Sequence, residues 1–260
     1  MDNINGQLAR LKREIVMAAC AAGEGHIASA FSILDILWVL YRQVLCLDPG
    51  NPAAPDRDRF ILSKGHGALA LYAILSERGF FSKEELKTFS AFDSRLGGHP
   101  DSTKVPGVEA STGSLGHGLP MGVGMALGMR IQRRAGRVFV LVGDGECNEG
   151  SIWEAALLAA HHKLNRLTCI VDSNRSTDRA LRVDDLSEKF RAFGWIATVV
   201  DGHDHQTVDT AARAFDKECP SAIIARTIKG KGCSMMENNP AWHHRVPTPE
   251  ELPIILQEFS

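Results

Sequence analysis

Residues Val138 to Asn174 read VFVLVGDGECNEGSIWEAALLAAHHKLNRLTCIVDSN. An apolar, β-branched run ends in Gly143-Asp144-Gly145, a helical pattern follows, and a second β-branched run, Thr168 to Asp172, leads to Asn174. This alternation is typical of a βαβ unit with parallel strands. Asp144 and Asn174 therefore follow the carboxyl ends of two successive strands, the edge at which open parallel sheets bind ligands.

The side chains at this edge indicate a metal and an anion. Asp144 and Asn174 offer hard oxygen ligands suited to Mg²⁺ or Ca²⁺. Gly143 and Gly145 allow backbone N–H groups to approach an anion, and the next helix directs its positive end to the same place. Asp-Gly is also a common turn dipeptide without a ligand. The second strand, ending at Asn174, favours a metal and diphosphate site over a simple turn.

Helical and strand patterns alternate along most of the chain. Helices are expected at 7–22, 30–45, 67–79, 119–134, 149–163, 184–194, 204–218 and 249–259, with another after the capping box of Ser82 and Glu85, and strands at 59–62, 137–142, 167–172, 196–200 and 222–227. The pattern predicts an α/β fold with a mainly parallel sheet and helices on both faces. We expect one domain over 1–260. The spacing of Gly122, Gly124 and Gly128 suggests close approach by another helix.

Composition excludes several classes of protein. The 260 residues carry a net charge of −2, which gives no reason to expect a nucleic-acid partner. Six scattered cysteines without a CxxC pair argue against a zinc site or a disulfide framework and for a reducing compartment. No secretory signal is visible in the first residues, and no apolar run approaches the ~20 residues that span a bilayer. We expect a cytoplasmic protein without membrane contact.

Six blocks of sequence fall in the order in which one enzyme family carries them. They are Gly25-His26-Ile27, SKGHG from Ser63, GHPD from Gly98, PGVEASTGSLGHG from Pro106, Gly143 to Gly150, and GKGCSMMENNPAWH from Gly230. Together with Asn174 they resemble the amino-terminal third of transketolase, and the resemblance implies a thiamine diphosphate-binding fold. The chain stops where the family's pyrimidine-binding domain should begin. We therefore expect that domain and the carboxyl-terminal domain on a partner chain.

The resemblance implies a set of site residues. The metal ligands would be Asp144, the side chain of Asn174 and the backbone carbonyl of Ser176, around Mg²⁺ or, in its place, Ca²⁺ or Mn²⁺. The implied cofactor-binding residues are His66, Gly113, Ser114, Leu115, Gly143, Asp144, Gly145, Glu146, Asn174 and His243.

Four histidines match the family's catalytic set: His26, His66, His99 and His243. Imidazole suits the movement of hydroxyl protons near neutral pH. We expect the other histidines at 161, 162, 203 and 205 to be ordinary helix or turn residues.

The implied activity is transfer of a two-carbon ketol unit from a ketose or ketose phosphate to an aldehyde acceptor. In the family, the glutamate that activates the cofactor lies in the pyrimidine-binding domain, so the chain should be active only with its partner. We expect a heterotetramer, two copies of this chain with two of the partner. Glu149 and Glu154 should lie near its symmetry axis, unless they are simply first-turn acids. The apolar Trp38 and Leu40 are expected in the interface.

Three departures from the family pattern bear on the substrate. His117 replaces a usual Gln, His244 replaces a usual Gly, and RSTDRALRVDD after Asn174 places Arg175, Arg179 and Arg182 in a short loop. The alternatives are a deoxyxylulose phosphate synthase-like or decarboxylating ketol synthase, a transketolase with a non-sugar aldehyde acceptor, and a non-catalytic binding module.

Overall fold

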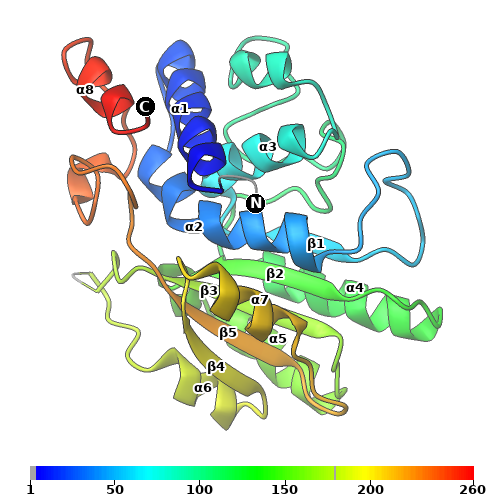
Figure 1. Ribbon diagram of the computed structural model, residues 1–260. Coiled ribbons are helices and arrows are strands. Elements are labelled where there is room, and N and C mark those ends of the chain that lie inside the picture. Colours follow the sequence, from blue (N-terminus) through cyan, green and yellow to red (C-terminus); the bar gives the residue numbers. More distant parts are fainter. Residues whose placement is uncertain (1–3, 179) are drawn as a thin grey trace.

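A computed structural model describes residues 4–178 and 180–260 (Figure 1). The strands are β1 (Arg59–Leu62), β2 (Val138–Gly143), β3 (Leu167–Ser173), β4 (Ile196–Asp201) and β5 (Ser221–Arg226). The α-helices are α1 (Ile4–Ala22), α2 (Ile27–Val39), α3 (Ala68–Glu77), α4 (Gly118–Ile131), α5 (Gly150–His161), α6 (Leu186–Ala192), α7 (His205–Arg213) and α8 (Glu251–Gln257). Short 3₁₀ or π segments are η1 (Leu40–Val44), η2 (Gly65–Gly67), η3 (Lys83–Thr88), η4 (Gly145–Asn148) and η5 (Pro240–Trp242).

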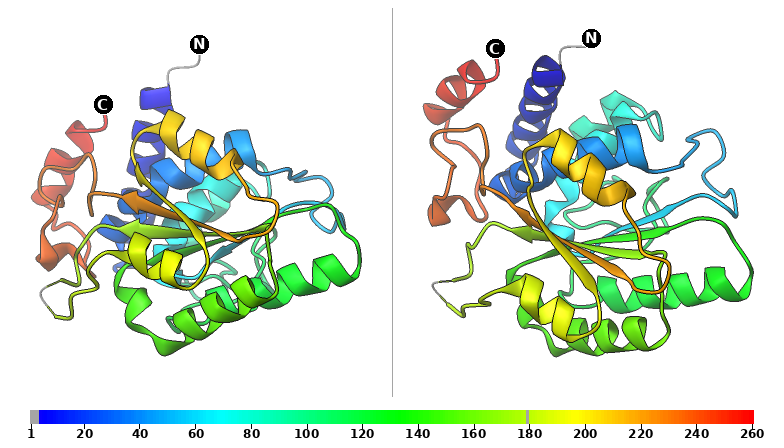
Figure 2. Two further views of the ribbon diagram at one scale, coloured as in Figure 1. Left: turned by 90° about the horizontal axis from the view of Figure 1, so that it is seen from below. Right: turned by 60° about the horizontal axis from the view of Figure 1, so that its bottom comes forward.

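The five strands form one parallel sheet in the order β1-β2-β3-β5-β4. The sheet lies between two layers of helices (Figure 2): α1, α2, α3 and α7 cover one face, and α4, α5 and α6 cover the other. Strands covered on both faces need apolar side chains on both sides, which explains the unbroken buried run at the start of β2. The α/β fold with a mainly parallel sheet and helices on both faces is confirmed.

The register of the sheet positions the site. Gly143 at the end of β2 pairs with Asp172 near the end of β3, and Asp172 pairs with Ala225 near the end of β5. The three loops that follow these strands therefore leave from the same edge. The backbone N–H of Asp144 donates to the carbonyl of Asp172 at 3.1 Å, which joins the loop after β2 directly to β3.

Several local expectations need correction. The expected helix at 30–45 becomes a π-helix from Leu40, and the segment after the confirmed Ser82–Glu85 capping box is a 3₁₀ helix. The helix expected to reach residue 218 ends at Arg213, because Ala214 is already extended. Of the α4 glycines, Gly122 is approached by Val140 of the sheet, not by a helix, while a Cβ at Gly124 or Gly128 would meet nothing within 4 Å.

The apolar segment Ile27–Val44 corrects two further expectations. By length and composition it could cross a membrane, contrary to the expectation from sequence, but 83% of it is buried inside the protein. Trp38 and Leu40 lie in the core with 2% and 0% exposure, so they are not available for an interface. The segment is the central helix of the larger core cluster.

Candidate active site

Asp144 is a buried carboxylate without a cationic side-chain partner. It is 3% exposed, and its oxygens accept hydrogen bonds from the backbone N–H groups of Gly145 (2.7 Å) and Arg175. Burial, reinforced by the nearby Asp172, raises the pKa of the Asp144 carboxyl. Within the described ranges it forms no ion pair. A charge desolvated in this way is stabilised by a cation, so the residue fits the metal-binding role that the sequence suggested.

Asn174 is held in one orientation by its neighbours. Its Nδ2 donates to Asp172 Oδ2 at 2.9 Å and to Ser32 Oγ at 3.2 Å, and its Oδ1 accepts from the backbone N–H of Ser176 at 3.0 Å. Asp172 is itself fully buried and paired with the ammonium of Lys64. The network fixes which end of the amide is oxygen, and Oδ1 is the end that a metal ion requires.

The described residues contain no group of three or more His, Cys, Asp and Glu side chains that could hold a metal. The expected ligand set does not need such a group, because it uses one carboxylate, one amide oxygen and one backbone carbonyl. The donors fit a hard divalent ion whose remaining positions are filled by phosphate and water.

Glu146 is expected to face the diphosphate through its backbone, and its side chain binds other parts of the protein. Its side chain is buried and accepts hydrogen bonds from Ser63 Oγ, from the N–H of Gly116 at 2.9 Å and from the N–H of Gly143 at 3.0 Å. Burial raises the pKa of this carboxyl. The residue therefore joins the segments after β1 and before α4 to the end of β2. Gly145 remains at the surface of the site, with Thr177 packed 3.1 Å from where its Cβ would be.

Three of the four expected histidines form one cluster. The ring centroids of His26 and His66 are 5.2 Å apart, and those of His26 and His243 are 5.3 Å apart. His244, one of the departures from the family pattern, joins the cluster with its ring centroid 4.5 Å from that of His26. Burial lowers the pKa of His26 to about 4 and that of His66 to about 2, so both rings are neutral at pH 7.

His99 lies in the irregular segment between η3 and α4, with its ring against Gly113. A Cβ on Gly113 would come within 3.0 Å of the His99 ring, and one on Gly65 would come within 2.8 Å of the Gly113 nitrogen. Both glycines are therefore required by close approach. Ser114 and Leu115 follow at the surface and are exposed.

Lys229 is a site residue that was not expected from the sequence. Its side chain is 6% exposed, and its Nζ donates to His243 Nδ1 at 2.8 Å. Burial and the nearby Lys64 lower its pKa to about 8. It forms no ion pair among the residues that the structure describes. It stands directly before the block that begins at Gly230, so its position beside that block was the available signal.

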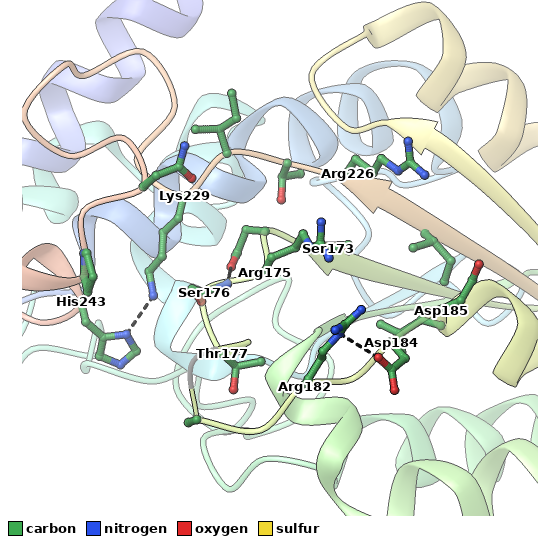
Figure 3. A pocket seen from close by; sticks show the side chains of 18 of the residues that line it. Ser173, Arg175, Ser176, Thr177, Arg182, Asp184, Asp185, Arg226, Lys229 and His243 are labelled. Atoms are coloured by element: carbon green, nitrogen blue, oxygen red, sulfur yellow. Dashed lines mark hydrogen bonds and ion pairs between the residues drawn. The ribbon is translucent and has the colours of Figure 1, made fainter.

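Asn174, Ser176, Lys229 and His243 line one cavity of about 1080 Å³ (Figure 3). Arginines at positions 175, 182 and 226 also line it, and Arg182 pairs with Asp184 at 2.8 Å. Arg179 lies outside the described residues.

Other expected residues lie apart from this cavity. Glu149 and Glu154 are exposed at and after the start of α5, and His117 is exposed at the start of α4. His203 and His205 are not ordinary turn residues, because both bind the buried carboxylate of Asp35 at 2.8 Å.

A protein-family model described as "Transketolase, thiamine diphosphate binding domain" matches residues 5–252. The chain belongs to the transketolase family. Transketolase-type transferase function and the thiamine diphosphate cofactor are thereby confirmed at the level of the family.

Similar proteins include both short and full-length transketolases. An apulose-4-phosphate transketolase subunit of Actinobacillus succinogenes is 40% identical over 266 residues, covering 100% of this chain and 96% of that protein. A 6-deoxy-6-sulfo-D-fructose transketolase subunit of a Clostridium species is 40% identical over 237 residues, covering 88% of this chain and 86% of that protein. Human transketolase is 40% identical over 251 residues, but the match covers 94% of this chain and only 40% of the human protein.

Solved structures agree with this assignment. The transketolase of Leishmania mexicana superposes with a TM-score of 0.90 at 29% identity, covering 100% of this chain and 41% of that chain. The transketolase of Campylobacter jejuni superposes with a TM-score of 0.89 at 30% identity, covering 99% of this chain and 43% of that chain. The chain thus spans about two fifths of full-length transketolases, whereas it spans nearly all of the proteins named as separate subunits.

Proposed function

We propose that this chain is the diphosphate-binding subunit of a split transketolase that moves a two-carbon ketol unit from a ketose to an aldehyde. One observation carries the proposal. Two buried charges without ion-pair partners, the carboxylate of Asp144 and the ammonium of Lys229, belong to loops at the same sheet edge as a histidine cluster. A divalent cation compensates the first charge, and a diphosphate compensates the second.

The residues divide into two groups around the cofactor. Asp144, Asn174 and the carbonyl of Ser176 would hold Mg²⁺, and Gly145 and Lys229 would face the diphosphate. Thiamine diphosphate, when bound, supplies the electron sink that cleavage of a ketose carbon–carbon bond requires. This chain would contribute the oxygen ligands of the metal, a buried cation and a cavity at the same edge of the sheet.

Two histidines have complementary proton roles. His26 Nδ1 lies 2.9 Å from the backbone carbonyl of His243, which can only accept, so Nδ1 carries the proton and Nε2 is free to accept one. His243 Nδ1 accepts from the Lys229 ammonium, so its own proton is on Nε2. A substrate hydroxyl between these rings can donate to His26 Nε2 and accept from His243 Nε2.

The active assembly would include a second copy of this chain together with a partner of a different sequence. Three of the similar proteins are named as subunits of a transketolase, which implies a further subunit in those enzymes. The partner of this chain would supply the pyrimidine-binding domain and its activating glutamate. Six free cysteines within the described residues are compatible with a cytoplasmic location.

The arginines of the cavity favour substrates that carry an anionic group. Arg226 has no carboxylate partner among the described residues, while Arg175 pairs with Asp178. The similar subunits are named for a phosphorylated and a sulfonated ketose. We propose the same class of anionic ketose as donor here, with an aldehyde acceptor that the shortened loop after Asn174 selects.

The experiment mixes the purified chain with its partner subunit, thiamine diphosphate and Mg²⁺. Ketol transfer from a ketose phosphate to an aldehyde is expected only when both subunits are present. Turnover by this chain alone would contradict the split-subunit proposal. Cofactor binding by the assembled pair without any ketol transfer would favour the non-catalytic module, and pyruvate as the required donor would favour a deoxyxylulose phosphate synthase-like enzyme.

A further inference from the structure

A buried cluster on the α2 side of the sheet lies outside the candidate active site. Asp35 of α2 is 7% exposed and accepts two hydrogen bonds of 2.8 Å, from His203 Nδ1 to its Oδ2 and from His205 Nε2 to its Oδ1. His203 lies in the turn after β4, and His205 begins α7. The cluster therefore joins a helix of the core to a turn at the carboxyl edge of the sheet.

The hydrogen bonds of His203 fix its tautomer. Its Nε2 lies 2.9 Å from the backbone nitrogen of Ile228, and a backbone N–H can only donate. Nε2 is therefore an unprotonated acceptor, and the ring proton is on Nδ1, where it is donated to Asp35. His203 is thus held as a neutral ring between a carboxylate and a main-chain amide.

Ile228 directly precedes Lys229, the buried cation of the site. The turn after β4 lies against this segment: the N–H of Gly202 donates to the carbonyl of Arg226 at 2.7 Å, and a Cβ on Gly202 would come within 2.5 Å of Thr227. Among the described residues, His203 is the side chain that binds the Ile228 amide. The contacts therefore run from Asp35 through His203 and Ile228 to Lys229 and on to His243.

We propose that His203, oriented by Asp35, is a positioning residue that sets the location of the Lys229 ammonium. The inference rests on the proposed function, in which Lys229 faces the diphosphate of the cofactor. A long lysine side chain has many rotamers, and a fixed main chain at its base limits the positions that the ammonium reaches. His205 shares the carboxylate of Asp35 but has no bond to Ile228, so it anchors α7 and does not position Lys229.

Two substitutions at position 203 separate the two bonds of the ring. Gln places an amide oxygen near the position of Nε2 and can still accept from the Ile228 N–H. Asn places an amide N–H near the position of Nδ1 and can still donate to Asp35, but it leaves Ile228 without its acceptor. The readouts are the affinity of the full chain for inorganic diphosphate with Mg²⁺, by calorimetry, and the free energy of unfolding in urea.

The His203→Asn variant is expected to bind diphosphate about tenfold more weakly, which is the scale of one lost charge-assisted contact. The His203→Gln variant should keep an affinity close to that of the unsubstituted chain. His205→Ala is the matched control and should lower stability without changing diphosphate affinity. In a Lys229→Ala background, His203→Asn should produce no further loss of affinity, because its effect passes through Lys229.

Equal affinities for the Asn and Gln variants, or an undiminished effect of His203→Asn without Lys229, would overturn the positioning role. That result would leave the proposed function intact, provided the unsubstituted chain binds diphosphate. Failure of the unsubstituted chain to bind diphosphate in the presence of Mg²⁺ would overturn the phosphate assignment of Lys229 and this inference with it.

Discussion

Asn174 and Asp172 are joined by a hydrogen bond of 2.9 Å from the amide nitrogen of the first to the carboxylate of the second. The same carboxylate is the partner of Lys64, and neither member of that ion pair is more than 2% exposed. The predicted metal ligand is therefore oriented by a buried ion pair.

Removing one member of the Lys64–Asp172 ion pair should destabilise the fold more than removing both. Asp172→Ala or Lys64→Met alone is expected to lower the free energy of unfolding by about 3–5 kcal/mol, because each leaves an uncompensated buried charge. The double variant should recover part of the loss. Urea unfolding of the three variants measures this, and additive single losses would show that the pair is not coupled.

Asp144→Ala should abolish stabilisation by Mg²⁺ and thiamine diphosphate in thermal unfolding, since it removes the charged ligand. Asn174→Ala should weaken it less, because the lost ligand is neutral. Asp209→Ala, which removes a carboxylate paired with Arg213 on α7, is the control and should respond as the unsubstituted chain does. Full stabilisation of the Asp144 variant would place the metal elsewhere.

Stability should fall as the pH falls from about 6.5 toward 4. A histidine in the unfolded chain binds a proton below its ordinary pKa of 6.5, whereas burial holds the pKa of His26 at about 4 in the folded protein. The unfolded state therefore binds more protons in this window, which favours unfolding. The rings near His26 are the histidines at 66, 99, 243 and 244, whose charges disfavour its protonation further.

The matched variants are His26→Asn and His66→Asn, which should both reduce this pH dependence of the unfolding free energy. His161→Asn changes an exposed ring on α5 and should not. A slope that persists unchanged in both cluster variants would assign the effect to other groups.

His26→Ala and His99→Ala should lower kcat/KM of the assembled enzyme by about 10²-fold, the usual scale for a positioned acid–base group. Cofactor affinity should stay near normal, because neither ring holds the residues assigned to the metal and the diphosphate. Lys229 is hydrogen-bonded to His243, and Asp144 is hydrogen-bonded to backbone N–H groups. A variant that loses the cofactor but keeps turnover would reverse these roles. His162→Ala, outside the cluster, is the control.

The layer formed by α4 and α5 should mediate self-association. Ile131 and Leu157 are 79% and 61% exposed, and Gly124 and Gly128 leave open space on α4. Ile131→Glu combined with Leu157→Glu should shift the assembly to a smaller species in light scattering without changing its circular dichroism. An unchanged mass would locate the contact on another face.

The sheet and the metal ligands were predictable because they depend on local patterns. Alternating β-branched runs and helical repeats are visible in a short window, and Asp144 and Asn174 follow two such runs directly. Helix ends and helix type were less predictable from the sequence. The segment Leu40 to Val44 has the composition of an α-helix, and only tertiary packing makes it a π-helix.

The contacts of Lys229 and Asp35 could not be derived from spacing. Asp35 lies 168 and 170 residues from its two histidine partners. A lysine before a glycine, or an aspartate within an apolar helix, has no periodic signature. These contacts depend on the strand order β3-β5-β4, which places the turn after β4 against the end of β5. Glu146 is similar, since two of its three donors, Ser63 and Gly116, lie 83 and 30 residues away along the chain.

The sheet order also has a consequence for how the chain folds. β2, β3, β5 and β4 lie within one continuous stretch of sequence, whereas β1 must close a long loop to pair with β2. Loop closure of that kind is entropically costly and tends to come late on a folding pathway. His26 precedes that loop and His66 lies within it, while Asp144 and Asn174 follow it. The phosphate end of the site is therefore expected to gain protection early in pulse-labelled refolding, and the histidine end to gain it with the last strand.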